Sequence, residues 1–367
     1  MINKRILKKA DFTTLIIVTI IVAVGVLIIG SATHVNLPDR GTSAFIKKQI
    51  LWYLIGLVVM SIVIYFDYHI YGRFANVIYI LNLAVLVVVL VMGRTTMGAQ
   101  RWINLGGFSL QPSELAKLAI IITLAKHLEN KEKILSIKDL FSVLLHIGIP
   151  MLLIMKQPDL GTSLVLCAIC FGMIFMAGIS TKLLVGMISG GMLSLPILWN
   201  FLKDYQKKRI LVFLNPEQDP LGAGYHVTQS MIAIGSGRLF GKGLFQGTQN
   251  QLNFLPEQHT DFIFSVLGEE FGFVGGLVLL LLYLILLLRF VNFATRAKDV
   301  FGMLIIIGVV SMFGFHILVN IGMTVGIMPV TGLPLPFMSY GGSSLITNMM
   351  AAGLVINVAM RRHKILF

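Results

Sequence analysis

Long apolar runs separated by short polar segments recur along the whole chain. Stretches of about 20 apolar residues, the length that crosses the hydrocarbon core of a bilayer, predict about ten helices. Their ranges are 12–32, 48–66, 76–93, 112–128, 139–155, 160–178, 181–200, 260–289, 300–328 and 343–360. A membrane β-barrel would instead show short segments of alternating polarity. The pattern predicts one all-α polytopic membrane domain over residues 1–367, with one long interruption at residues 201–259.

The composition excludes a soluble enzyme. Hydrophobic residues make up 56% of the chain and charged residues only 12%, against about 25% charged residues in an ordinary soluble domain. A net charge of +13 would favour nucleic-acid binding in a soluble protein. Here the cations lie between apolar segments, where anionic lipid headgroups are the nearest partners. We therefore expect contacts with membrane lipids and no nucleic acid.

The distribution of Lys and Arg predicts the orientation. Sixteen of them lie in the segments that are cytoplasmic if the N-terminus is cytoplasmic, and six lie in the short segments on the other side. Positive charge is enriched in short cytoplasmic loops, whereas long loops largely escape this rule. Both termini are therefore expected in the cytoplasm. The 201–259 segment becomes one large extracytoplasmic loop between the seventh and eighth predicted helices.

This large loop has two parts. Lys207, Lys208 and Arg209 precede an apolar ILVFL run, a pattern typical of a helix along the membrane interface. The glycine-rich stretch GSGRLFGKG follows, but it matches neither nucleotide-binding glycine motif, so we reject a nucleotide site. Its backbone N–H groups either bind a diphosphate or simply make turns. We expect the loop to fold back onto the membrane face.

The strongest candidate for chemistry is FLPEQHTDFIF, at the start of the eighth predicted helix. Pro256 ends the preceding segment and Thr260 would cap the helix, which places Asp261 in the first turn at the outer face. An acid there either complements the helix dipole or, beside Glu257 and His259, serves as a general base.

Two further groups lie near the outer face. Glu114 and Lys117 are three residues apart on one predicted helix face, so we expect an ion pair that either braces the helices or lines a polar cavity. Trp102 is an ordinary interface anchor, and Arg101 beside it either clamps a phosphate or touches a headgroup. Asp159 is expected to be a helix-start acid.

No metal site is legible in the sequence, although a divalent cation that bridges a diphosphate and Asp261 or Glu257 stays open. The histidines are scattered and have no metal-ligand spacing. They include His34, His69, His127, His146, His226, His316 and His363. The proline- and glycine-rich segment PVTGLPLPFMSYGGSS is expected to close over the same outer face, because such backbone is tolerated near the membrane only when it is buried or lines a cavity.

Five segments resemble, in order, the signature segments of the SEDS family (shape, elongation, division and sporulation). They are QRWINLGGFSLQPSELAKL, QPDLGTSLV, GYHVTQSMIAIGSGRLFGKG, LPEQHTDFIFSVLGEEFG and PVTGLPLPFMSYGGSS, between residues 100 and 344. The variant GTQNQLNFLPEQHTDFIF and the short termini are more similar to the elongation-type than to the division-type members.

The resemblance implies a peptidoglycan glycosyltransferase that polymerises lipid II at the outer face of the bacterial cytoplasmic membrane during cell elongation. It implies that Asp261 is the essential acid and that Arg101, Glu114 and Lys117 line the polar cavity. It also implies a class B penicillin-binding protein transpeptidase as partner, within the elongation machinery.

Our hypothesis for the chemistry follows from the shape of lipid II, which has a lipid tail, a diphosphate and a disaccharide. Asp261 accepts the proton of the acceptor 4-hydroxyl, which attacks the donor's anomeric carbon with inversion and expels undecaprenyl diphosphate. Cations offset the charge of the leaving group. The candidate substrate-binding residues are Arg101, Trp102, Glu114, Lys117, Arg209, Lys242, Glu257 and His259, with Lys207, Lys208 and Arg238 as further loop cations.

Two other functions compete with this hypothesis. A lipid II transporter would use the same intramembrane polar groups as a path, and a scaffold would only hold the transpeptidase. A transporter needs polar groups through the full membrane depth, and the first, second, fifth, seventh and tenth predicted helices contain almost none. The sequence therefore favours the enzyme.

Overall fold

The computed structural model describes residues 11–34, 41–96, 99–105, 108–129, 136–215, 219, 222–255 and 257–361, and it is almost entirely helical there. The N-terminal basic residues and Pro256 lie outside this part of the chain. Each of the ten predicted ranges coincides with a helix. These helices are α2 (Phe12–His34), α3 (Gly41–Tyr65), α5 (Ala75–Met92), α6 (Pro112–Glu129), α7 (Ile137–Lys156), α8 (Leu160–Ala177), α9 (Thr181–Phe201), α13 (Ile263–Thr295), α14 (Val300–Thr324) and α15 (Gly342–Met360).

Eight of these helices are long and apolar enough to cross a membrane, and the chain is a multi-pass membrane protein. The two that fall outside this group are α6 and α9. Helix α6 carries Glu114, Lys117, Lys126 and Glu129 within its 18 residues, which lowers its hydropathy. It is nevertheless one of the most deeply buried helices, so its charges need partners inside the protein.

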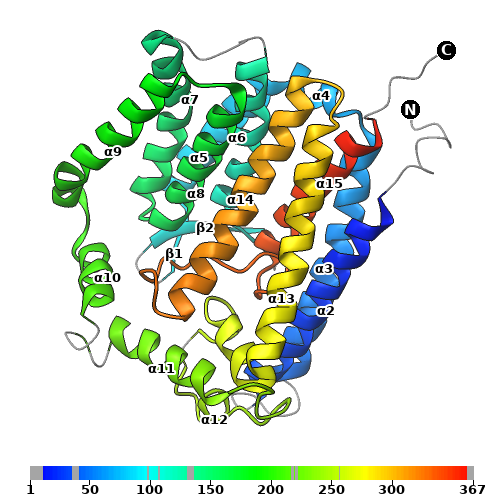
Figure 1. Cartoon of the computed structure of the whole chain (residues 1–367), viewed down its shortest axis with the longest axis vertical. Coiled ribbons are helices and arrows are strands. Elements are labelled where there is room, and N and C mark those ends of the chain that lie inside the picture. Colours follow the sequence, from blue (N-terminus) through cyan, green and yellow to red (C-terminus); the bar gives the residue numbers. More distant parts are fainter. Residues whose placement is uncertain are drawn as a thin grey trace.

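The helices form a bundle around α14, which packs against α6, α8, α13 and α15 (Figure 1). The first turn of α2 and the last turn of α15 lie on one side of the bundle, and the helices of the 201–259 loop lie on the opposite side. The short helix α4 (Tyr68–Arg73) lies on the same side as the ends of α2 and α15, where Asp67 pairs with Arg361 at 3.2 Å.

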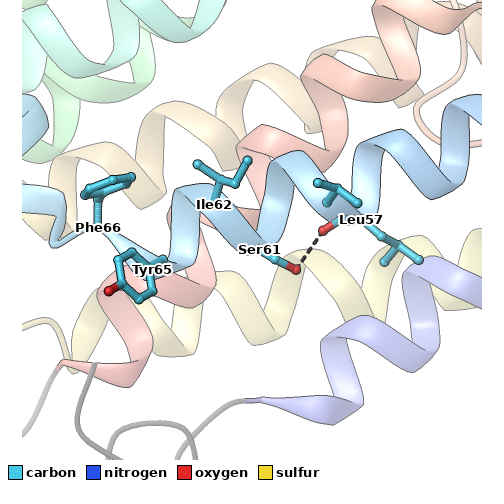
Figure 2. A pocket seen from close by; sticks show the side chains of 6 residues that line it. Leu57, Ser61, Ile62, Tyr65 and Phe66 are labelled. Carbon is cyan, nitrogen blue, oxygen red and sulfur yellow. Dashed lines mark hydrogen bonds between the residues drawn. The ribbon is translucent and has the colours of Figure 1, made fainter. Parts of the chain in front are cut away.

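The outer surface of the bundle is apolar, as expected where helices face lipid. Figure 2 shows one hollow on this surface, along α3, lined by Leu57, Ile62, Tyr65 and Phe66. The Ser61 hydroxyl, also in this hollow, donates to the carbonyl of Leu57 at 2.7 Å. Apart from this group and the Tyr65 hydroxyl, the side chains that line the hollow are apolar, and none of them is charged.

A three-stranded antiparallel sheet precedes α6, and the sequence pattern did not predict it. Its strands are β1 (Arg94–Thr96), β2 (Ala99–Leu105) and β3 (Phe108–Leu110), paired in the order β1-β2-β3. Strands β1 and β3 have only three residues each, too few for alternation to be read. The Gly-Gly pair between β2 and β3 is a hairpin signal that would have indicated them. The sheet carries Arg101 and Trp102 on β2.

Between residues 204 and 255, the described part of the 201–259 segment contains three helices, α10 (Asp204–Leu214), α11 (Ala223–Ser236) and α12 (Thr248–Gln251). The glycine-rich stretch between α11 and α12 lies across a kink in α13, where Gly272 has a φ of 66°. The backbone N–H of Phe273 donates to the carbonyl of Arg238 at 2.8 Å, and that of Gly243 donates to the carbonyl of Glu270 at 3.0 Å. The glycines therefore permit backbone-to-backbone packing.

Candidate active site

The turn before α13 differs from the sequence prediction. Helix α13 begins at Ile263, and no side chain caps its first turn. Thr260 was predicted to be that cap, and this was wrong: its hydroxyl donates back to the carbonyl of Glu257 at 3.2 Å. The carbonyl of Thr260 itself accepts a hydrogen bond from the Ser339 hydroxyl at 2.7 Å. These bonds wind residues 257–262 into a separate turn, so Asp261 precedes the helix instead of lying in it.

The backbone of Asp261 is held while its carboxylate is left available. The carbonyl of Asp261 accepts a hydrogen bond from the Asn320 amide at 2.9 Å. The side chain is partly exposed, and among the described residues its carboxylate has no hydrogen-bond or ion-pair partner. A methyl group placed on Gly332 would lie 3.4 Å from Oδ2, so the segment Pro329–Gly341, here called the outer loop, borders the carboxylate.

The surroundings of Asp261 set its proton affinity. Burial and the nearby charge of Glu257 together raise the pKa of Asp261 to about 6, against the opposing charges of Arg209 and Arg101. At neutral pH the carboxylate is mostly ionised yet still able to hold a proton. A general base is most effective when its pKa lies near the working pH.

Arg101 anchors the turn between α7 and α8. Its Nε donates to the carbonyl of Gln157 at 3.1 Å, and its Nη2 donates to the carbonyl of Pro158. Its Nη1 lies 3.9 Å from Asp159 Oδ1. Asp159 caps α8, as expected, by accepting from the Thr162 N–H at 3.2 Å. Arg101 is therefore fixed in place while its charge still acts on Asp261.

Arg209, on α10, reaches the outer loop. Its Nη1 donates to the carbonyl of Val330 at 3.2 Å, and its guanidinium lies 5.8 Å from the centre of the Tyr205 ring. Burial and the charge of Arg209 lower the pKa of His226 on α11. Arg101 and Arg209 thus act on Asp261 from two separate segments, together with Glu257 of its own turn, and Arg209 and Glu257 also act on His226.

The expected ion pair between Glu114 and Lys117 is present and buried. Lys117 Nζ lies 2.8 Å from Glu114 Oε1, and the two residues are 0% and 3% exposed. Lys117 also contacts His316 Nε2 at 3.0 Å, and His316 Nδ1 lies 3.1 Å from the carbonyl of Pro334 in the outer loop. Through this chain of contacts the pair reaches the outer loop that borders Asp261.

The remaining predicted binding residues lie in other surroundings. The His259 ring packs against Tyr340 at 5.5 Å, and burial lowers its pKa. Lys242 pairs with Glu269 at 2.8 Å in the contact between the glycine-rich stretch and α13. Trp102 is half-buried on β2. Within the described ranges, no three His, Cys, Asp or Glu side chains gather as a metal-binding group.

Sequence reasoning missed the residues that hold the site together, chiefly His316, Asn320 and Ser339. His316 had been dismissed as one of several scattered histidines. The available signal was the spacing of His316 and Asn320, four residues apart within the apolar segment FHILVNIG. Polar residues inside a membrane helix are costly without partners, and two on one helix face indicate a shared partner.

Comparison with known proteins places these segments in a wider group. The family model FTSW_RODA_SPOVE, described as "Cell cycle protein", matches residues 12–364. The chain is 42% identical to "Peptidoglycan glycosyltransferase MrdB" of Escherichia coli (strain K12), over 96% of this chain and 94% of that protein. It is 36% identical to "Peptidoglycan glycosyltransferase RodA" of Treponema pallidum (strain Nichols), over 98% and 100% of the two chains.

Solved structures share the fold. A chain from a structure described as "Structural coordination of polymerization and crosslinking by a peptidoglycan synthase complex" matches with a TM-score of 0.83 at 35% identity, over 97% of this chain and 99% of that chain. The crystal structure of the Thermus thermophilus rod shape determining protein RodA matches with a TM-score of 0.73 at 33% identity, over 97% and 98%.

Proposed function

The chain belongs to the family of cell cycle proteins that includes FtsW, RodA and SpoVE, and on this premise we propose that it is a peptidoglycan glycosyltransferase, as its relatives are named. The substrate is lipid II, which the enzyme polymerises into glycan strands at the outer face of the bacterial cytoplasmic membrane. The observation that carries this proposal is the carboxylate of Asp261, which has no partner in the part of the chain that the structure describes, borders the outer loop and lies in the field of two arginines.

Asp261 acts as the general base. Its carboxylate takes the proton from the 4-hydroxyl of the acceptor sugar as the hydroxyl oxygen attacks the anomeric carbon of the donor. The bond from that carbon to the diphosphate oxygen breaks, the configuration inverts, and undecaprenyl diphosphate leaves with the bonding electrons. The raised pKa supports this role, because a base with a pKa near the working pH combines availability with driving force.

The arginines offset the negative charge of the leaving diphosphate. Arg209 is the better candidate for direct contact, because among the described residues it uses a single nitrogen, Nη1, to bond the carbonyl of Val330. Nε and Nη2 of Arg101 already donate to carbonyls of the α7–α8 turn. Arg101 therefore contributes its charge from a fixed position. Charges that are already oriented need no rearrangement during the reaction.

The proposal has two further parts, a partner protein and a divalent cation. The structure of a peptidoglycan synthase complex that this chain matches supports a transpeptidase partner of the penicillin-binding type. Asp261 or Glu257 would hold a divalent cation, which would offset charge on the leaving diphosphate. Titration of a chelator into the polymerisation assay tests the cation, and re-addition of Mg²⁺ or Mn²⁺ is the control.

The experiment that tests the function uses purified protein and lipid II in detergent, with and without the transpeptidase partner. The partner's transpeptidase serine is blocked, so that only glycan polymerisation is read. We expect polymer from the native chain and none from Asp261→Ala. The unfolding temperature of the variant should equal or exceed that of the native chain, which shows that the variant is folded. Polymer of the same length and amount from Asp261→Ala would remove Asp261 from the chemistry.

Reconstitution into liposomes separates the enzyme from a transporter. Labelled lipid II is placed in one leaflet, and its appearance in the other leaflet is measured beside polymer formation. Movement across the bilayer without any polymer would replace the proposed function by transport.

A further inference from the structure

Two polar side chains lie one turn apart on α14, which packs against four other helices of the bundle. His316 and Asn320 are 2% and 0% exposed, in a helix that is otherwise largely apolar. Residues four apart lie on the same helix face. Buried polar groups of this kind cost stability unless their hydrogen bonds are satisfied. Their partners therefore indicate why the chain keeps them.

Asn320 joins the turn before α13 to the outer loop. Its amide nitrogen donates to the carbonyl of Asp261 at 2.9 Å and to the carbonyl of Leu333 at 2.8 Å. One side chain thus fixes the backbone that carries the Asp261 carboxylate and the backbone that borders it.

His316 holds the next residue of the outer loop and does so in one tautomer. Lys117 Nζ can only donate, so His316 Nε2, 3.0 Å away, accepts from it. The ring proton is then on Nδ1, which donates to the carbonyl of Pro334 at 3.1 Å. Pro334 has no backbone N–H. Its carbonyl is therefore the single backbone group through which this residue is anchored.

The segment held by His316 is continuous with the supports of Asp261. After Pro334, the N–H of Leu335 donates to the Ser339 hydroxyl at 2.8 Å, and that hydroxyl donates to the carbonyl of Thr260 at 2.7 Å. Before it, Gly332 borders the Asp261 carboxylate. A shift of the Pro334 carbonyl therefore moves both the residue beside the carboxylate and the bond that shapes the Asp261 turn.

We propose that His316 is a positioning residue for glycosyl transfer: it holds the outer loop against Asp261 through the carbonyl of Pro334, with its tautomer set by Lys117. This inference rests on the proposed function, because the outcome of positioning is the rate of that reaction. The competing role is simpler: His316 would only provide an acceptor for the buried Lys117 ammonium, and its contact with Pro334 would be incidental.

Two substitutions separate these roles, because each keeps one of the two contacts. In His316→Asn the amide nitrogen replaces Nδ1 and still donates to Pro334, but the acceptor for Lys117 is lost. In His316→Gln the side-chain oxygen reaches the Nε2 position and accepts from Lys117, but the donor to Pro334 is lost. His316→Leu loses both. The full chain, with its transpeptidase partner and lipid II, is assayed for kcat and KM, and heat unfolding is followed for each variant.

If His316 is a positioning residue, the order of the Asn and Gln variants by kcat should be the reverse of their order by heat stability. The kcat of His316→Asn stays within about threefold of the native value. The kcat of His316→Gln falls at least about tenfold, with KM changed less than about twofold, because small misplacements of a reacting group cost large factors in rate. Heat stability follows the reverse order, since an underpartnered buried ammonium costs more than an unpaired carbonyl. If kcat instead follows heat stability, with Gln as good as or better than Asn, the positioning role is overturned.

His146→Leu is the matched control, because His146 on α7 is also a hydrogen-bonded histidine within the bundle, with Thr123 as partner at 2.9 Å. We expect it to lower heat stability and to leave kcat within about twofold, since it has no contact with the outer loop. A native chain that makes no polymer would overturn the proposed function itself. An active native chain in which Gln outperforms Asn overturns only the role of His316.

Discussion

Gly332 borders the carboxylate of Asp261, and a methyl group added to it would be in van der Waals contact with that carboxylate. A methyl group on Gly332 would lie 3.4 Å from Oδ2, and the φ of Gly332 is 75°, a left-handed value that favours glycine. The bare backbone therefore forms one wall beside the base. This wall is what the outer loop contributes directly to the site, and the contacts of His316, Asn320 and Ser339 keep it there.

Replacement of Gly332 by alanine should lower kcat for glycosyl transfer strongly and the free energy of unfolding only modestly. The added methyl takes space beside Oδ2 that the acceptor hydroxyl needs, and the left-handed backbone costs an alanine about 1–2 kcal/mol. Gly178→Ala is the control, because Gly178 has a φ of 86° at the end of α8, far along the chain from the outer loop. Equal losses of kcat in both variants, measured by polymer formation, would show that strain alone is responsible.

The dependence of rate on pH should report Asp261. A base must be ionised, so kcat/KM should rise with pH through about 6 and level off above it, since the pKa of Asp261 is about 6. Glu257→Gln removes a negative neighbour and should move this rise to lower pH. Arg209→Gln removes a positive neighbour and should move it to higher pH. Shifts in the same direction for both variants would contradict the assignment of this rise in kcat/KM to the ionisation of Asp261.

The ionised carboxylate of Asp261 should also lower the free energy of unfolding at neutral pH. Its pKa is raised from 3.8 to about 6, so the folded state holds the proton more tightly than the unfolded chain does. The stability from this group is present below about pH 4 and is lost as pH rises through about 6. Asp261→Asn lacks this loss, so it should unfold at a higher temperature than the native chain at neutral pH. A lower unfolding temperature for the Asn variant would contradict the raised pKa.

The ion pair between Glu114 and Lys117 should behave as a buried pair. Removal of one partner leaves an uncompensated buried charge, so Lys117→Met should lower the free energy of unfolding by about 3–5 kcal/mol, and the double variant with Glu114→Gln should recover part of this. The control pair, Lys126 and Glu129, is more exposed, and its loss should cost less than about 1 kcal/mol. Additive effects of the two single substitutions, in heat or denaturant unfolding, would show that the pair is not coupled.

The sequence predicted the helical framework well, because membrane helices are specified by the lengths of apolar runs. Each predicted range became a helix, and the spacing of Glu114 and Lys117 correctly predicted their ion pair. These are local features: hydropathy over about 20 residues, or two side chains one turn apart on a helix.

The features that were missed depend on contacts between distant segments. Thr260 had the residue type and position of a cap, but Ser339, 79 residues later, holds the backbone of that turn. The glycine-rich stretch was expected to bind phosphate or make turns, and it does make turns. The pattern did not show that these turns pack against the kink in α13. Such pairings leave no periodic signal in the chain.

The most direct test of the central claim is the turnover of Asp261→Asn at saturating lipid II, measured together with its affinity for lipid II. The amide has nearly the size of the carboxylate but cannot accept a proton. We predict a loss of about 10²–10⁴ in kcat, while the affinity for lipid II stays within about threefold of the native value. A kcat within about fivefold of the native value, in a variant that is folded and binds lipid II, would contradict the role of Asp261 as the base.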